Sequence, residues 1–311
     1  MPSIAEAGPL IALVAACAFF MSQSHRFLSF QNLSLILQQT IVVAVIAIGQ
    51  TLIVLTAGID LSCGMVMAFG SIIMTKFAVV LGVPPILAIF CGIGASALFG
   101  LLNGVLVTRV KLPSFIVTLG TLNIAFALTQ LYSNAETVSN LPDAIMFFGN
   151  TFRLGPAEVT YGTVLALLLY FVTWFVLRNT VPGRHLYALG NNPEAARLMG
   201  LSSDKILLTV YSLSGAIYGI AALLLVSRTG VGDPQAGQTD NLDSITAVVL
   251  GGTSLFGGRG SVVGTLLGAL IVGVFRNGLT LIGVSSVYQV LITGILVILA
   301  VAADKLSHRR S

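Results

Sequence analysis

Residues 35–57 read LILQQTIVVAVIAIGQTLIVLTA, a stretch of apolar side chains with a few uncharged polar ones and no Asp, Glu, Lys or Arg. A transmembrane α-helix needs about 20 predominantly apolar residues, because the hydrocarbon core of a bilayer is about 30 Å thick. This stretch is long enough, and it therefore predicts a helix that crosses a membrane.

The same pattern recurs along the whole chain. Only 8% of the residues are charged and the mean hydropathy is +0.99, whereas soluble domains carry about 25% charged residues. Ten apolar runs are separated by Gly, Pro or charged clusters: 8–23, 35–57, 63–82, 85–107, 113–132, 161–178, 206–227, 242–256, 261–283 and 286–303. We predict an all-α, polytopic transmembrane helix bundle of about ten spans, forming a single domain over residues 1–311.

The first run, 8–23, is short, and a cleaved signal peptide is the alternative to a span. The residues before it include Glu6 and neither Lys nor Arg. A signal peptide begins with a basic segment, so a true span is the preferred interpretation.

The distribution of Lys and Arg predicts the orientation, because cytoplasmic loops of membrane proteins are enriched in these residues. With the N-terminus inside, the inner loops and C-terminus hold Arg109, Lys111, Arg178, Arg184, Arg197, Lys205, Arg259, Lys305, Arg309 and Arg310. The outer side holds Arg26, Lys76, Arg153, Arg228 and Arg276. Both termini are therefore predicted to be cytoplasmic. The net charge of +4 follows from this topology, and it gives no indication of a nucleic-acid partner.

Several kinds of chemistry lack the residues they need. No Asp or Glu lies deep within a predicted span, which disfavours transport driven by protons or sodium. The run GGTSLFGGRG at 251–260 has the glycine separation of a phosphate-binding loop, but Gly258 and Arg259 stand where Lys and Ser or Thr are required. The three cysteines and three histidines are scattered. We therefore expect no catalytic residue, no cofactor and no metal site.

A short polar segment interrupts the apolar sequence at 191–200, NNPEAARLMG. Pro193 suits the first turn of a helix, Glu194 stands at the positive end of its dipole, and Gly200 supplies a stop. A helix exposed on a membrane body suggests a mechanical contact with another protein. A solvated loop helix without a partner is the alternative.

Two weaker patterns concern how the spans pack. The sequences TAGID at 56–60 and TGVGD at 229–233 end the second and seventh spans, and an offset of five helices would invert the second copy, as in inverted-repeat transporters. Glycines also recur at helical spacing, which lets helix backbones approach closely. These are Gly100 with Gly104, Gly215 with Gly219, and the series Gly260, Gly264 and Gly268.

Four ordered motifs carry a resemblance to a known family. They are GNNPEAARLMG at 190–200, SRTG at 227–230, LDSITAVVLGGTSLFGGRG at 242–260 and GIDLSCG at 58–64. From about residue 35 to the C-terminus the chain resembles the membrane permeases of ribose-type sugar importers of the ABC class. It departs from the family at Cys63, where a small aliphatic residue is common, and in its short N-terminal region.

The resemblance implies a multi-pass permease of the bacterial inner membrane. Its partners would be a second permease chain, most simply in a homodimer, an ABC ATP-binding subunit that hydrolyses ATP, a periplasmic sugar-binding protein and the surrounding lipid. The cargo would be a monosaccharide such as ribose, fructose, xylose or galactose. A stand-alone facilitator or channel is the alternative, and a membrane enzyme or scaffold comes third.

The resemblance also distributes roles among residues. The ATPase-coupling helix would comprise Pro193, Glu194, Ala195, Ala196, Arg197, Leu198, Met199 and Gly200. Candidates for the pathway or a gate are Asp60, Ser62, Gly251, Gly252, Gly257 and Gly258. Asp60 and Ser62 are expected to cap the third helix at the cytoplasmic surface, with direct sugar contact as the alternative. Candidates for docking the binding protein are Arg228, Asp233 and Asp240, with Asp243 beside them at the outer mouth.

Overall fold

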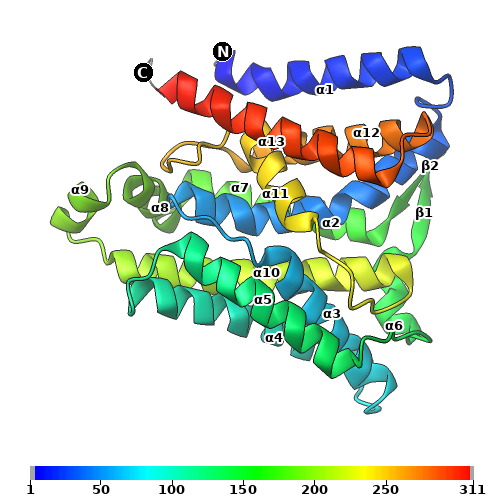
Figure 1. The fold of residues 1–311 in the computed structure, drawn as a ribbon, viewed down its shortest axis with the longest axis horizontal. Helices are drawn as coiled ribbons and strands as arrows, with labels where there is room; N and C mark the ends of the chain where they lie inside the picture. The colour runs from blue at the N-terminus through cyan, green and yellow to red at the C-terminus, as the bar shows by residue number, and fades with distance from the viewer. Residues whose placement is uncertain (1–3, 309–311) are drawn as a thin grey trace.

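The computed structural model describes residues 4–308, which form a bundle of helices with one small hairpin (Figure 1). The described chain contains six helices long and apolar enough to cross a membrane. They are α2 (Phe30–Leu55), α4 (Pro85–Thr108), α5 (Ser114–Ser133), α7 (Tyr161–Asn179), α10 (Ser203–Thr229) and α12 (Val262–Leu281). This confirms the prediction of an all-α, polytopic membrane protein.

The remaining elements complete the bundle or connect its helices. They are α1 (Ile4–Gln23), α3 (Cys63–Val79), α6 (Asp143–Met146), the 3-10 helix η1 (Phe147–Gly149), β1 (Thr151–Leu154), β2 (Ala157–Thr160), α8 (Val181–Asn191), α9 (Pro193–Leu198), α11 (Asp240–Leu250) and α13 (Ser286–His308). The two strands pair antiparallel, and the hairpin is held to α2 because Ser34 hydrogen-bonds the backbone of Glu158.

Each predicted apolar run contains a helix, but the prediction of a full span over 242–256 is wrong. Helix α11 ends at Leu250 after 11 residues, and at 1.5 Å per residue it covers only about half of a bilayer core. The chain then turns at Gly251 and Gly252, where Gly252 has a φ of +82° that favours glycine. Hydropathy extends past this turn because Leu255 and Phe256 follow it.

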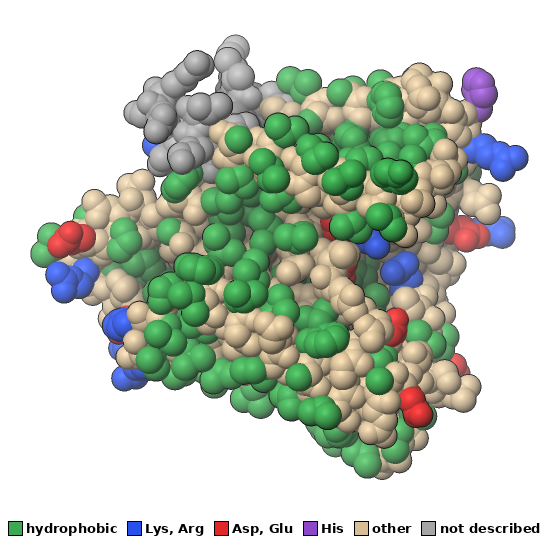
Figure 2. Space-filling view, viewed as in Figure 1, with side chains coloured by type: hydrophobic (Ala, Val, Ile, Leu, Met, Phe, Trp, Pro, Cys, Tyr) green, Lys and Arg blue, Asp and Glu red, His purple; other side chains and the backbone are tan. Residues whose placement is uncertain are grey.

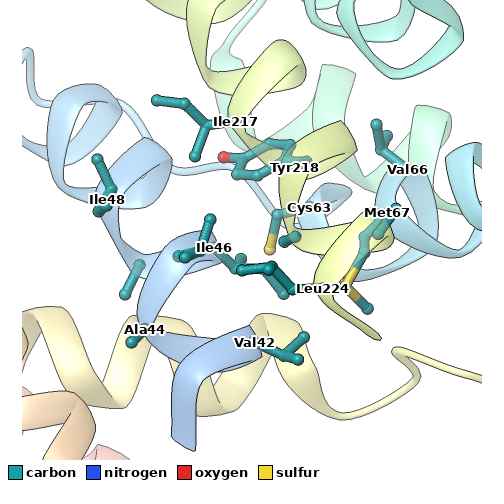
Figure 3. Close-up of a cluster of buried hydrophobic side chains, with 14 of the residues drawn as sticks. Val42, Ala44, Ile46, Ile48, Cys63, Val66, Met67, Ile217, Tyr218 and Leu224 are labelled. Atoms are coloured by element: carbon teal, nitrogen blue, oxygen red, sulfur yellow. The ribbon is translucent and has the colours of Figure 1, made fainter. Parts of the chain in front are cut away.

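Helix α2 forms the centre of the core. It packs against α10 and α12, and most of its apolar window is buried inside the protein itself rather than available to lipid. Figure 3 shows side chains from three helices meeting there. They are Val42, Ala44, Ile46 and Ile48 from α2, Cys63, Val66 and Met67 from α3, and Ile217, Tyr218 and Leu224 from α10.

Glycines allow the closest helix contacts. Gly100 of α4 faces Gly215 of α10, and a Cβ on Gly215 would lie only 2.5 Å from the Ser96 carbonyl oxygen. Two glycines of α12 lie directly on backbone at the end of α11, Gly268 on Ala247 and Gly264 on Gly251 just after the helix, so a side chain at either position would overlap it. These contacts agree with the predicted close packing. Gly260 was expected to continue the α12 series, but it lies in the loop before the helix.

Two helices, α3 and α11, begin inside the bundle rather than at one of its ends (Figure 1). The first turn of α11 lies against the segment before α3, because the Asn241 side chain donates a hydrogen bond to the Leu61 carbonyl at 3.3 Å. Beside this contact, the sulfur of Cys63 lies 3.6 Å from the Ser244 hydroxyl. The chain therefore carries two interrupted helices that meet at their N-terminal ends.

Candidate functional site: a protruding helix, its junction and a buried polar network

The segment predicted as a coupling helix forms α9, which projects from one end of the bundle (Figure 1). Asn192 caps it, because its side-chain oxygen accepts hydrogen bonds from the backbone N–H groups of Glu194 at 3.1 Å and Ala195 at 3.0 Å. The helix ends at Leu198, and Gly200 supports the turn that follows with a φ of +83°. The structure therefore confirms the short helix that the local sequence signals predicted here.

The outer face of α9 mixes apolar and charged side chains. Leu198 and Met199 are 80% and 70% exposed, while Ala196 is buried and faces the bundle. Glu194 and Arg197 are both exposed, and they form no ion pair within the described structure. Exposed apolar side chains flanked by charged side chains without an ion-pair partner suit a contact with another protein.

The base of α9 is tied to distant parts of the chain through a set of close backbone contacts. Gly258 donates its N–H to the Leu55 carbonyl at 3.0 Å, and Gly190 packs so closely on Leu55 that a Cβ would overlap its oxygen. Ala57 lies against Gly257, which has a φ of +85°. We call these five residues the glycine junction. It joins the end of α2, the end of α8 and the loop 251–261.

Tyr187 adds a further link between α8 and this loop. Its hydroxyl donates a hydrogen bond to the Gly260 carbonyl at 2.9 Å. Burial raises the pKa of the Tyr187 phenol, so the group keeps its proton and remains a donor. A displacement of α8 and α9 would therefore reach α2 and the loop 251–261 directly.

The structure corrects the expectation for Asp60 and Ser62. Asp60 is only 1% exposed and Ser62 is fully buried, so neither lies at the cytoplasmic surface. Ser62 makes no side-chain cap to the first turn of α3. Instead, Asp60 accepts two hydrogen bonds from Ser62, from its backbone N–H at 2.8 Å and from its hydroxyl at 2.6 Å.

These two residues belong to a polar network between α3, α4 and α5. Asn103 donates to the Ser62 hydroxyl at 3.1 Å, and Thr121 donates to the Asn103 carbonyl oxygen at 2.8 Å. Sequence reasoning missed Asn103 and Thr121. A signal was present, since an Asn within the apolar run 85–107 is a polar group that must find a partner.

The three residues predicted to dock a binding protein do not act as one group. Asp233 binds its own loop, because its carboxylate accepts a hydrogen bond from the Gln235 N–H at 2.8 Å. Arg228 and Asp240 instead line a cavity between helices. Asp243, expected at the outer mouth, is buried and forms an ion pair with Arg276 at 3.4 Å.

Comparison with known proteins gives the family. The family model described as branched-chain amino acid transport system / permease component matches residues 32–301. The chain belongs to this permease family. The fructose import permease protein of Rhizobium meliloti is 48% identical to it over 303 residues, which cover 96% of this chain and 84% of the relative.

Two other relatives of this permease also match over nearly their whole length. The ribose import permease protein of Bacillus subtilis (strain 168) is 38% identical, over 96% of this chain and 92% of the relative. The galactose/methyl galactoside import permease protein of Escherichia coli (strain K12) is 33% identical, over 98% and 95%. The chain is therefore a multi-pass membrane permease and not itself an enzyme.

Proposed function

We propose that this chain is the membrane-spanning permease subunit of an ATP-driven ABC importer, which translocates a monosaccharide delivered by a periplasmic binding protein. The protruding helix α9 and its glycine junction are the observations that support coupling of transport to ATP hydrolysis. The names of three relatives, which specify fructose, ribose and galactose, support a monosaccharide as cargo. We further propose that it lies in the bacterial inner membrane with both termini in the cytoplasm.

In this proposal, α9 receives force from the ATP-binding subunit. Its exposed Leu198 and Met199 would enter an apolar groove of that subunit, while Glu194 and Arg197 pair with charges around the groove. Movement of α9 would then shift the glycine junction as a unit, because packed backbones transmit displacement with little deformation. A facilitator would have no use for such an element.

The two interrupted helices support an inverted repeat as part of this proposal. Helix α2 is followed by α3, which begins inside the bundle, and α10 is followed by α11, which also does. In Figure 1, α3 and α11 leave their meeting point in different directions. We propose that these pairs are the corresponding elements of the two halves, and that two copies of the chain enclose one pathway.

A double variant tests the coupling role. Replacing Glu194 and Arg197 with Ala removes two exposed charges, and exposed charges contribute at most about 1 kcal/mol to folding. The variant should therefore insert normally and retain its thermal stability. Sugar uptake and sugar-stimulated ATP hydrolysis should both fall steeply.

The matched control replaces two other exposed charges at the same end of the bundle, Lys111 and Asp204, which form an ion pair. Their double Ala variant should transport normally, because these side chains bind each other rather than a partner. Unchanged uptake and unchanged ATPase stimulation in the Glu194 and Arg197 variant would contradict the coupling role.

A further inference from the structure

A cavity of about 420 Å³ lies between α2, α10, α12 and the segment 230–239. Sites for small molecules typically measure about 300–1,000 Å³, so its volume suits a solute of monosaccharide size. Nine polar side chains contribute to its wall: Gln39, Thr40, Arg228, Gln235, Gln238, Thr239, Asp240, Arg276 and Thr280. We call it the charged cavity.

The charged cavity lies in the half of the bundle away from α9. Arg228 is next to the last residue of α10, and Thr280 next to the last residue of α12, and both helix ends lie at the end opposite α9 (Figure 1). In Figure 2, basic and acidic side chains gather around a hollow to the right of centre on the visible face. The cavity is therefore separate from the glycine junction.

Several polar groups on its wall have no partner within the described residues. The Thr40 hydroxyl is buried and makes no hydrogen bond. The Arg228 guanidinium and the Asp240 carboxylate form neither a hydrogen bond nor an ion pair there, although both line the same cavity. Polar groups in protein interiors are normally satisfied. Of these three groups only the Thr40 hydroxyl is buried, whereas Arg228 is exposed and Asp240 is half-buried. A buried unpaired hydroxyl beside two charged groups without protein partners indicates a site that a polar solute completes.

The charges of the site favour an uncharged solute. Arg276 is neutralised by its ion pair with Asp243, and the positive charge of Arg228 is balanced by the negative charge of Asp240. An anionic solute such as a sugar phosphate would need an excess of positive charge. The side-chain amides of Gln39 and Gln238 offer both donors and acceptors, as does the Thr40 hydroxyl, and this combination matches the hydroxyl groups of a sugar.

Gly273 of α12 keeps the space open. A side chain at this position would overlap the Thr40 hydroxyl, so a larger residue would fill the wall and displace Thr40. We propose that the charged cavity binds an uncharged monosaccharide during transport. This inference rests on the proposed function and deepens it by assigning the solute a place within the permease chain.

The first test is uptake of radiolabelled D-fructose, D-ribose and D-galactose by proteoliposomes that hold the complete importer. Gln39→Leu keeps the size of the side chain and removes its hydrogen bonds, so uptake should fall by about tenfold, as expected for one lost hydrogen bond in a tight site. Gln38→Leu is the matched control. Its residue is adjacent on α2 but lines a different groove, so uptake should stay within about twofold of the unchanged protein.

The second test measures binding without transport. In a chain whose native cysteines, Cys17, Cys63 and Cys91, are replaced by Ala, Gln39→Cys is labelled with a membrane-impermeant thiol reagent. Saturating D-fructose, D-ribose or D-galactose should slow the labelling of Gln39→Cys, whereas labelling of Gln38→Cys should not change. D-fructose 6-phosphate should give no protection.

The outcomes separate this inference from the proposed function. If the unchanged complex transports none of the sugars in the presence of ATP, the proposed function fails. If it does transport one, but Gln39→Leu behaves as Gln38→Leu does and that sugar gives Gln39→Cys no protection, the charged cavity is not the site. Protection by the sugar phosphate in place of the sugar would also overturn the inference.

Discussion

Replacing Gly190 with Ala is the sharpest perturbation of the glycine junction. A Cβ on Gly190 would overlap the Leu55 carbonyl oxygen and would lie 2.6 Å from the Gly258 nitrogen. Ordinary contacts of this kind are about 3.4 Å or longer, so the backbones of Gly190 and Leu55 must separate by more than about 1.5 Å. That separation stretches the 3.0 Å hydrogen bond from Gly258 to Leu55.

The magnitude follows from these two effects. Overpacking of a close contact costs about 1–3 kcal/mol, and loss of a backbone hydrogen bond costs about 0.5–1.5 kcal/mol. We therefore expect Gly190→Ala to destabilise the chain by about 1.5–4.5 kcal/mol. Because α8 leads into α9, we also expect the variant to uncouple ATP hydrolysis from sugar uptake.

The assay is thermal unfolding of the detergent-solubilised chain, together with uptake and ATP hydrolysis by the assembled importer. Gly94→Ala is the matched control, since a Cβ on Gly94 of α4 meets no atom within 4 Å. Its unfolding temperature and its uptake should equal those of the unchanged protein. If Gly190→Ala were as stable and as active as Gly94→Ala, the glycine junction would not be the rigid link described above.

Three further predictions concern other parts of the chain. Gly264→Ala should lower thermal stability because even a methyl group would overlap the backbone of Gly251, whereas Gly120→Ala, which has open space, should not. Equal unfolding temperatures would contradict the packing. Asp60→Ala removes the acceptor of two Ser62 hydrogen bonds, and each donor left unsatisfied costs about 1–3 kcal/mol. Asp60→Asn keeps an acceptor oxygen and should therefore unfold at a higher temperature than Asp60→Ala. Leu198→Cys should react with an impermeant thiol reagent only in inside-out vesicles, and reaction in intact cells would reverse the proposed orientation.

The positions of the helices could be predicted from sequence because the bilayer fixes a length and an apolar composition for each span. The same reasoning misplaced Asp60 and Ser62. It assumes that a polar segment between two apolar runs lies at a membrane surface, whereas here the chain returns into the bundle before α3 begins. Hydropathy contains no information on such a return, since partners from α4 satisfy the polar groups.

The parts of the candidate site also differ in whether sequence alone could predict them. Helix α9 could be predicted because Pro193 in its first turn, Glu194 at the positive end of its dipole and Gly200 just after its end are local signals. The glycine junction could not, because Leu55, Gly190 and Gly258 are far apart in sequence and meet only in the folded chain. The charged cavity likewise depends on four separate segments.

ATP-driven sugar import is tested most directly by measuring sugar uptake into proteoliposomes that contain this chain, its ATP-binding subunit and its sugar-binding protein. Uptake of D-fructose, D-ribose or D-galactose is compared with ATP, with a non-hydrolysable ATP analogue, and without the ATP-binding subunit. We expect accumulation against a gradient only with ATP and all three components. Equal uptake by the permease chain alone would identify a facilitator and contradict ATP-driven import.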